Sequence, residues 1–430
     1  MGTAGPRCFS ASGSLLLPLL AAGALALIMT ATHAAQGQTF SVLHSFEVSD
    51  GAEPFAGPTL DAAGDLYGTT QYGGRLDCDE GGVPGCGVAY RLKKRNSIWT
   101  FSVLHEFKGR NGNFLPTYPG QITFSPRNVL FGAQVFGGND AGILYDLHPP
   151  ATPSGAESGL WRYHIEHTYG NGNDGGQPGP IVFDPSGNIF GAEADGGPPG
   201  AAGLVYELTP SSDGWNETIL YAFQGGSDGS NPWGVALDPS GKNIFGVTSS
   251  GGNQQCYNNV GCGTVYELKR SGSKWTKTTL HVFQQDTEGG DPGPLLRDRS
   301  GNLFGVTGEG ASGNGGTIWE LSPSGSGWVF KVLYTFPWPT EEFTGPSQLV
   351  MGADGTFFGV NNGGGAHGYG SVFRLESARG RWKYTDLYSF NGGADGCYPR
   401  GPVALAPNGN IYGTTQECAE GYGNVWEVAP

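Results

Sequence analysis

Carboxylates that interrupt a repeated pattern are the residues in this sequence best suited to acid–base chemistry. A short motif ending in Gly recurs along the chain, and most of its copies are followed by Thr, Ser, Gly or Gln. The copies that break the pattern are followed by Glu193 and Asp195, by Glu309, and by Glu417 and Glu420. A general acid and a general base need different surroundings, because their pKa values must differ, so catalytic groups are expected where a repeat is broken. Two such carboxylates would suit glycoside hydrolysis, and solvated loop charge is the alternative interpretation.

A second set of acidic residues recurs in register with the repeat, a few positions after a conspicuous aromatic residue. Its members are Asp50, Asp174, Asp228, Glu288, Glu341 and Asp395, with Asn111 at the remaining position. Their oxygens could hold Ca²⁺ or a polar ligand such as a glycan around a channel mouth. Asp-Gly and Glu-Gly pairs also form turns in their own right, and a motif present in most repeats usually marks how the unit folds. The sequence favours the structural interpretation, so we expect no cofactor, with Ca²⁺ as the one it would allow.

Other catalytic chemistries find no support in the sequence. His44, His105 and His281 stand where other repeats place Tyr221, Tyr334 and Tyr388, which identifies them as side chains of a repeated strand. No G-x-S-x-G elbow and no GxxxxGK[ST] phosphate loop occurs. Neither an activated serine nor a nucleotide phosphate site is therefore expected.

The elements that must position these residues are short strands in a sevenfold repeat. The clearest copies of the Gly-terminated motif are Asn188-Ile189-Phe190-Gly191, Asn243-Ile244-Phe245-Gly246, Asn302-Leu303-Phe304-Gly305 and Asn410-Ile411-Tyr412-Gly413, with looser copies ending at Gly68, Gly132 and Gly359. A Val-Tyr type segment follows each copy, as in residues 263–268. A segment such as residues 179–184 precedes it, joined by turn-forming Pro-Ser-Gly-Asn or Pro-Asn-Gly-Asn. With a Trp-initiated strand ending in Leu-x-x-Phe, each unit contains four antiparallel strands, which we call a, b, c and d and which are typical of a propeller blade.

The fourth strand of the last repeat is found at the other end of the chain. The Trp-initiated strand follows its own repeat only six times, and the seventh repeat stops at Val428. Residues 40–46 carry an additional Leu-x-x-Phe strand with no repeat before it. Because a ring of blades leaves no open edge when one blade is shared between the termini, we predict an all-β, seven-bladed propeller over residues 36–430, closed by the N-terminal strand.

Several spaced motifs together resemble the GloVer (Gloeo-Verruco) tandem repeat of exported bacterial proteins. The best matching stretches are residues 387–396, 410–415 and 263–268. The resemblance covers nearly all of the chain after residue 35 and implies export and a repeat architecture. It implies no catalytic residue.

The six cysteines that follow the N-terminal segment can form local disulfides. Cys8 lies in residues 1–35, whose Arg7, apolar run and small residues at the end are typical of a cleaved secretory signal. Many pairings are possible, and proximity in the sequence favours Cys78 with Cys86, Cys256 with Cys262, and Cys397 with Cys418. Metal binding is the alternative, but no paired C-x-x-C spacing accompanies these cysteines. All six fall in b–c loops or d–a connections, which emerge on one face of a propeller.

Charge and hydropathy exclude two classes of partner. The formal net charge of -15 creates a field that repels nucleic acid and anionic membranes. No apolar run after the signal is long enough to span a bilayer. We therefore expect a secreted protein, extracellular or periplasmic, that is released and monomeric.

These observations predict a secreted, non-catalytic propeller that binds a polysaccharide, an envelope component or a protein on its disulfide-bearing face. The alternative is a carbohydrate-active hydrolase or lyase that uses Glu193, Asp195, Glu309 or Glu417 on the same face. Convergence of two of these carboxylates across a concave pocket would favour the enzyme. Binding would involve Asp50, Asp174, Asp228, Glu288 or Asp395 if the acidic series forms the site.

Overall fold

The computed structural model describes residues 38–430 except 77, 81, 110–117, 139, 151–159, 171–172, 254–255, 257–258, 312–313, 338–344 and 419–420. Residues Gln38–Pro430 form one compact unit. The predicted signal segment, Asn111, Glu341 and Glu420 lie outside the described residues. Among the described residues, no helix is long and apolar enough to cross a membrane.

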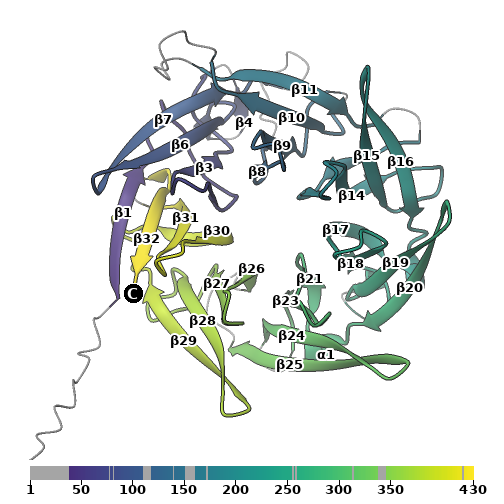
Figure 1. Ribbon diagram of the computed structural model, residues 1–430. Helices are drawn as coiled ribbons and strands as arrows, with labels where there is room; N and C mark the ends of the chain where they lie inside the picture. Colours follow the sequence, from purple (N-terminus) through teal and green to yellow (C-terminus); the bar gives the residue numbers. More distant parts are fainter. Residues whose placement is uncertain are drawn as a thin grey trace, which may run out of the picture. The chain divides into compact units, whose positions relative to one another are not determined.

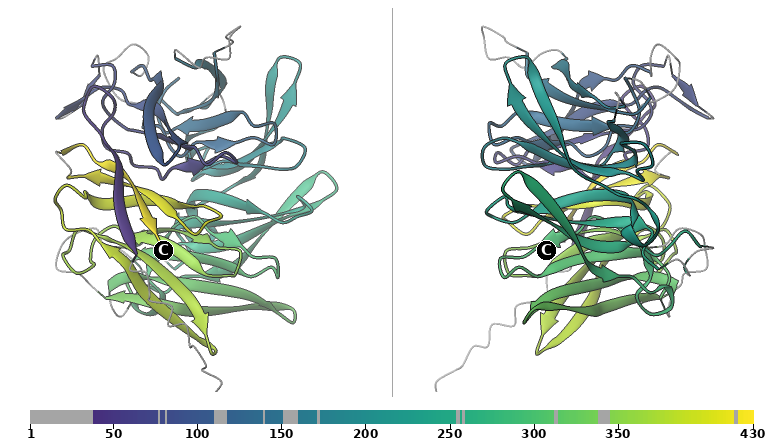
Figure 2. Two further views of the ribbon diagram at one scale, coloured as in Figure 1. Left: turned by 60° about the vertical axis from the view of Figure 1, so that its left-hand side comes forward. Right: turned by 90° about the vertical axis from the view of Figure 1, so that its right-hand side faces the viewer.

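Seven antiparallel sheets are arranged in a ring (Figures 1 and 2), which confirms the predicted seven-bladed propeller. Blade one contains β2 (Thr59–Leu60), β3 (Leu66–Thr69), β6 (Val88–Arg95) and β7 (Ile98–Glu106). Blade two contains β8 (Thr123–Phe124), β9 (Leu130–Gln134), β10 (Ile143–His148) and β11 (Arg162–Thr168). Blade three contains β12 (Gly175–Pro178), β13 (Val182–Phe183), β14 (Ile189–Gly196), β15 (Leu204–Ser211) and β16 (Gly214–Ala222). Blade four contains β17 (Ser230–Leu237), β18 (Asn243–Ser250), β19 (Thr264–Ser271) and β20 (Lys274–Val282).

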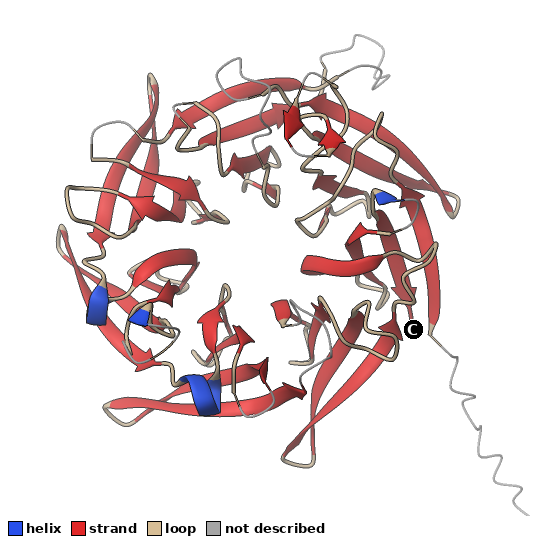
Figure 3. Cartoon of the chain, turned by 180° about the vertical axis from the view of Figure 1, so that it is seen from behind, coloured by secondary structure: helices blue, strands red, loops and turns tan. Residues whose placement is uncertain are grey.

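The remaining blades repeat this order. Blade five contains β21 (Gly290–Pro292), β22 (Leu296–Arg297), β23 (Leu303–Glu309), β24 (Asn314–Ser324) and β25 (Gly327–Pro337). Blade six contains β26 (Pro346–Met351), β27 (Phe357–Asn361), β28 (Ser371–Ala378) and β29 (Arg381–Ser389). Blade seven contains β30 (Cys397–Leu405), β31 (Ile411–Glu417), β32 (Asn424–Ala429) and β1 (Thr39–Ser45). A hairpin of β4 (Asp79–Glu80) and β5 (Val83–Pro84), a 3₁₀ turn η2 (Gly226–Asp228) and one helical turn α1 (Gln285–Glu288) lie in connections (Figure 3).

The N-terminal strand completes the last blade, as predicted. β1 pairs antiparallel with β32, with Phe40 opposite Val428 and Val42 opposite Trp426, and the two strands run side by side in Figure 1. The Phe40 ring stacks on Tyr388 of blade six at 4.0 Å, and Phe46 is buried. This one short strand therefore closes both the sheet and the ring.

Each blade places the Gly of strand b opposite a large ring on strand c. The seven pairs are Gly68–Tyr90, Gly132–Tyr145, Gly191–Tyr206, Gly246–Tyr266, Gly305–Trp319, Gly359–Phe373 and Gly413–Trp426. A Cβ on any of these glycines would overlap the opposing ring. The ring in turn contacts the last aromatic residue of strand d in the preceding blade, as Tyr266 contacts Phe223 at 5.1 Å. The repeated motifs thus form a continuous aromatic belt between blades.

A second set of ring contacts joins the outer strands of neighbouring blades. In five of the seven interfaces, the His or Tyr inside Leu-x-x-Phe stacks almost parallel on an aromatic residue of the next blade. The pairs are His44–Phe101, His105–Tyr163, His281–Phe330, Tyr334–Tyr384 and Tyr388–Phe40, with centroids 3.8–4.5 Å apart. In the other two interfaces, the position of the second ring is taken by Glu217, opposite His167, and by Lys277, opposite Tyr221.

Removing β1 tests the closure of the ring. We expect a chain lacking residues 36–46 to misfold or to unfold at a far lower temperature, because the edge of β32 is exposed and the buried Phe46 side chain is lost. Loss of the Phe46 ring alone costs about 3–5 kcal/mol. A chain that begins at residue 38 retains β1 and is the matched control. Equal melting temperatures, measured by circular dichroism, would contradict the closure.

The stacked rings also predict a pH dependence. Burial lowers the pKa of His105 to about 4, and the charge of Lys108 adds to the effect. Because the unfolded chain binds a proton at His105 near pH 6.5 and the folded chain does not, stability falls as pH drops from about 6.5 to about 4. Three other blades have Tyr at the position of His105. We therefore expect His105→Tyr to lose about 2 kcal/mol less of its free energy of unfolding over this pH range than the unmodified protein does, after allowance for partial exposure. Denaturant titrations at pH 7 and pH 4.5 measure it, and equal slopes against pH in both proteins would refute the assignment.

Candidate binding site in the central channel

A cavity of about 960 Å³ occupies the centre of the ring and is lined by all seven blades. The lining comes from strand a and the residues around its start, and from the end of strand b and the residues directly after it. These two segments lie side by side, as the pairing of Pro178 with Glu193 shows. Since strand a starts at a d–a connection and strand b ends at a b–c loop, the cavity opens toward the face that carries both types of loop.

Aromatic and amide side chains dominate the functional groups of the channel. The aromatic residues are Phe55, Tyr118 and Trp233, and the amides are Gln71, Gln121, Asn231, Gln348 and Asn362. Phe55 is 40% exposed, and Arg400 lies over its ring at 4.7 Å. Planar rings and amides are the groups that orient a polar ligand with apolar faces in a pocket. The lining thus presents both apolar ring faces and hydrogen-bonding amides to the cavity.

Two carboxylates reach the channel from blade five. Burial raises the pKa of Asp291, and burial together with the negative charge of Asp291 raises the pKa of Glu309. Both line the cavity. In blade seven, two blades further round the ring, the guanidinium of Arg400 attracts Glu417 and Glu53.

Backbone strain at the start of strand a recurs around the ring. The residue directly before a Pro has a positive φ of 47–55° in six blades, at Glu53, Tyr118, Gln177, Asn231, Asp291 and Tyr398. A residue before Pro prefers an extended backbone, and a non-Gly residue at positive φ is strained, so this conformation persists only because the surrounding structure imposes it. Tyr118, Asn231 and Asp291 belong to the channel lining. Sequence reasoning missed these residues, although each lies in an X-Pro pair soon after the conspicuous Gly of the d–a connection.

The four candidate catalytic carboxylates do not meet in the channel. Glu309 lines it, whereas Glu193 is fully buried beside Asp174 and Glu217. Asp195 is exposed and accepts a hydrogen bond from the N–H of Gly196 at 2.8 Å. Glu417 is exposed at the end of β31. The structure therefore brings none of these four together across the cavity.

The acidic series makes contacts within its own blades. The partners on strand d are His44 for Asp50 at 3.0 Å, Tyr221 for Asp228 at 3.0 Å, His281 for Glu288 at 2.8 Å and Tyr388 for Asp395 at 2.9 Å. Each of these carboxylates also accepts a backbone N–H from the d–a connection, at Glu47, Gln224, Gln284 and Asn391 respectively. Asp174 differs, because it lies 3.4 Å from His167 and also faces Glu217. None of the five residues is part of the channel lining.

The three predicted disulfides are confirmed. Cys78–Cys86 and Cys256–Cys262 each close a b–c loop, and Cys397–Cys418 joins the start of strand a to the b–c loop of blade seven. Cys397 directly precedes Tyr398 and is followed closely by Arg400. Covalent links therefore hold loops on the face toward which the channel opens.

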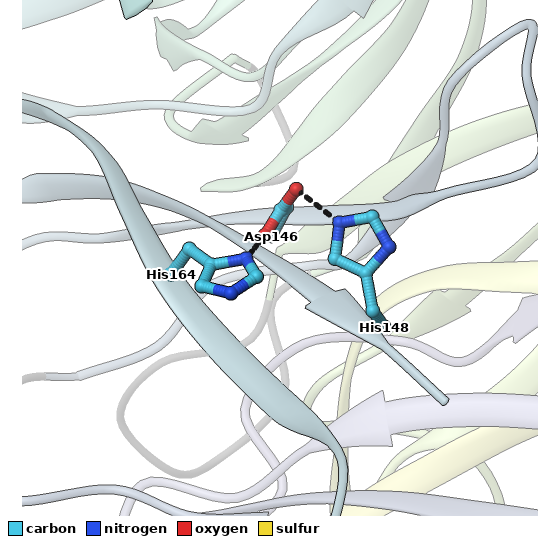
Figure 4. A group of neighbouring side chains, drawn as sticks. All are labelled: Asp146, His148 and His164. Carbon is cyan, nitrogen blue, oxygen red and sulfur yellow. Dashed lines mark hydrogen bonds and ion pairs between the residues drawn. The ribbon is translucent and has the colours of Figure 1, made fainter. Parts of the chain in front are cut away.

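Two groups of side chains in the described part of the chain have the composition of a metal site. The first, shown in Figure 4, is Asp146 and His148 on β10 with His164 on β11. His148 Nε2 lies 2.7 Å from one oxygen of Asp146, and His164 Nδ1 lies 3.0 Å from the other. The ring nitrogens that face the carboxylate are thus already paired with it. The second group consists of His167, Asp174 and Glu217.

Comparison with known proteins supports the fold and the repeat. Residues 152–342 match the family model of the Gloeobacter/Verrucomicrobia repeat, which confirms the predicted resemblance over that part of the chain. No curated protein gives a significant sequence match. The chain is a seven-bladed β-propeller that carries this repeat.

Solved structures with a similar arrangement share little sequence with it. The extracellular domain of a hybrid two-component system from B. thetaiotaomicron is 12% identical with a TM-score of 0.51, and the alignment covers 91% of this chain and 41% of that one. A periplasmic gluconolactonase from Pseudomonas aeruginosa is 16% identical with a TM-score of 0.49, covering 80% and 92%. The nidogen/laminin complex gives 15% identity and a TM-score of 0.41, covering 70% and 90%. At these identities the similarity concerns the propeller fold alone.

Proposed function

We propose that this protein is an exported, non-catalytic propeller that binds a polysaccharide at the mouth of its central channel. The lining of the channel carries the proposal, because rings at Phe55, Tyr118 and Trp233 share the cavity wall with amide side chains on a rigid frame. A sugar offers apolar faces for the rings and hydroxyl groups for the amides, so both kinds of group are satisfied. The disulfide-linked loops border the same opening and extend the contact surface.

Export is supported by the cysteine chemistry. Three disulfides form and persist in an oxidising compartment, and the predicted signal in residues 1–35 would deliver the chain there. The negative net charge of -15 favours a neutral or basic ligand over nucleic acid or another polyanion.

Binding without catalysis is favoured by the separation of the carboxylates. Hydrolysis of a glycosidic bond requires an acid and a second carboxylate on opposite sides of the bond. Among the four candidates, Glu309 lines the channel, and its carboxylate neighbour Asp291 comes from the same blade. Both groups therefore approach a ligand from one side.

The first experiment combines binding with a search for products. The protein from residue 36 to 430 is applied to a glycan array and to soluble polysaccharides, with and without Ca²⁺, and released reducing ends are measured. We expect retention of a polysaccharide without product. Released sugars would establish an enzyme instead, and absence of any sugar binding would overturn the proposal in favour of an envelope component or a protein ligand.

Removing an aromatic ring from the channel lining should weaken the binding of the polysaccharide. Trp233→Ala is expected to raise the Kd about tenfold, which corresponds to about 1.4 kcal/mol of lost contact energy. Val329→Ala, at a 54% exposed position on the outer strand β25, is the control and should leave the Kd unchanged. Affinity electrophoresis measures both, and an unchanged Kd in Trp233→Ala would place the ligand outside the channel.

A further inference from the structure

Four ionisable side chains meet where blade two joins blade three. His167 comes from β11, Asp174 from the connection between the blades, Glu193 from β14 and Glu217 from β16. His167 Nε2 lies 3.4 Å from a carboxylate oxygen of Asp174 and 3.4 Å from one of Glu217. One ligand atom from each of these three residues falls within 4.8 Å of the others. We call these four residues the blade 2–3 cluster.

Glu193 is the most unusual member of the cluster. Its side chain is 0% exposed, and neither carboxylate oxygen has a hydrogen-bond partner of ordinary geometry. One oxygen lies against Gly175, the residue that follows Asp174, so the carboxylate points into the cluster. Burial and the charges of Asp174 and Glu217 together raise the pKa of Glu193 to about 10. A buried carboxylate without a donor is costly unless a cation or a proton compensates it.

The other acids of the cluster are also short of donors. Asp174 Oδ1 and Glu217 Oε1 are buried without a hydrogen-bond partner. Among the described residues, His167 is the one basic side chain that faces these acids, at 3.4 Å from both Asp174 and Glu217. The neighbouring hydroxyl groups of Tyr169 and Tyr206 bond to each other at 2.7 Å.

The interface between blades three and four has a cation at the position equivalent to Glu217. In blade four, Lys277 occupies the place that Glu217 has in blade three, and its Nζ lies 2.8 Å from Asp228. The acid of the repeat is thus neutralised there by a cation from the next blade. In the blade 2–3 cluster, the corresponding position carries another acid instead. The cluster therefore lacks the lysine that the neighbouring interface has, and His167 is its one basic side chain.

We propose that the blade 2–3 cluster binds one divalent transition metal ion, such as Zn²⁺ or Mn²⁺, which ties blade two to blade three. The imidazole of His167 and the carboxylates of Asp174 and Glu217 form a mixed ligand set that suits these ions, with the buried Glu193 beside them, whereas Ca²⁺ prefers oxygen ligands alone. The ion takes the place of the stacked rings that join five other interfaces. The side chains of His167, Asp174 and Glu217 are 16%, 6% and 15% exposed, so the ion can enter from solvent. None of the four residues lines the channel, so this site is separate from the proposed polysaccharide site.

Zn²⁺ titration of the tag-free protein tests the site. Protein from residue 36 to 430 is stripped with a chelator, and bound Zn²⁺ is counted by mass spectrometry of the metal and by calorimetry. We expect one equivalent attributable to the cluster and a melting temperature that rises by a few degrees with Zn²⁺, because a ligand that binds only the folded state stabilises it. Ca²⁺ at the same concentration should not displace Zn²⁺. No bound Zn²⁺, or displacement by Ca²⁺, would overturn the proposal.

Two variants distinguish a bound metal ion from the alternative, in which a proton on Glu193 compensates its burial. Glu193→Gln mimics the protonated acid, so it should fold normally while its affinity for Zn²⁺ falls by about tenfold or more. Glu217→Phe restores the ring found at the equivalent positions Phe101 and Phe330, and we expect a folded protein whose melting temperature no longer responds to Zn²⁺. Undiminished Zn²⁺ binding in both variants would refute the site.

Two control variants test whether the bound Zn²⁺ is at the blade 2–3 cluster. Glu288→Gln changes the acid of another interface and should leave Zn²⁺ binding unchanged. His164→Ala removes a ligand of the group in Figure 4 and should also retain the equivalent bound by the cluster. Loss of that equivalent in His164→Ala, together with its persistence in Glu193→Gln, would place the ion at Asp146 instead.

Discussion

The close packing of a Gly on strand b against a ring on strand c is the constraint on which the rest of this structure depends. In each blade, a Cβ at the Gly would overlap the ring, so strand b accepts no other residue there. The ring is thereby held where the last aromatic residue of the preceding blade reaches it, as Phe46 reaches Tyr90 at 5.2 Å. Seven such contacts form a closed belt, and the final contact exists only because β1 returns Phe46 to the ring.

The parts of the structure that repeat could be predicted from the sequence. The Gly-terminated and Leu-x-x-Phe motifs are packing requirements, so their count and order revealed the blades, the shared blade and the loops that carry the disulfides. The register shift between strands c and d, such as that between Val205 and Tyr206, leaves no sequence signal, because a bulge depends on pairing with the partner strand. The strained residues before Pro were also not foreseen, since a local preference for extended backbone argues against them.

The candidate site was less predictable because it depends on which blade supplies the neighbour. Glu193 was singled out for breaking the repeat, and it does occupy an exceptional environment, but between blades rather than in the channel. Glu217 attracted no attention, because its position on an outer strand is typical of a solvated side chain. Its importance emerges only when blade two places His167 beside it. A contact between two blades depends on a residue from each of them, and these residues are far apart in the sequence. The motif of a single repeat therefore does not reveal it.

Blade three differs from the other blades because charged side chains take part in its outer-strand contacts with both neighbouring blades. Its contact with blade two uses His167 and Glu217, and its contact with blade four uses Tyr221, Asp228 and Lys277, whereas the other interfaces use stacked rings. Charge interactions respond to ions and protons far more than ring packing does. Glu193 in the cluster directly precedes Ala194 in the channel lining, and successive residues of a strand face opposite sides. The cluster and the channel wall therefore use adjacent residues of one strand, β14, whose opposite faces form the blade interface and the cavity lining.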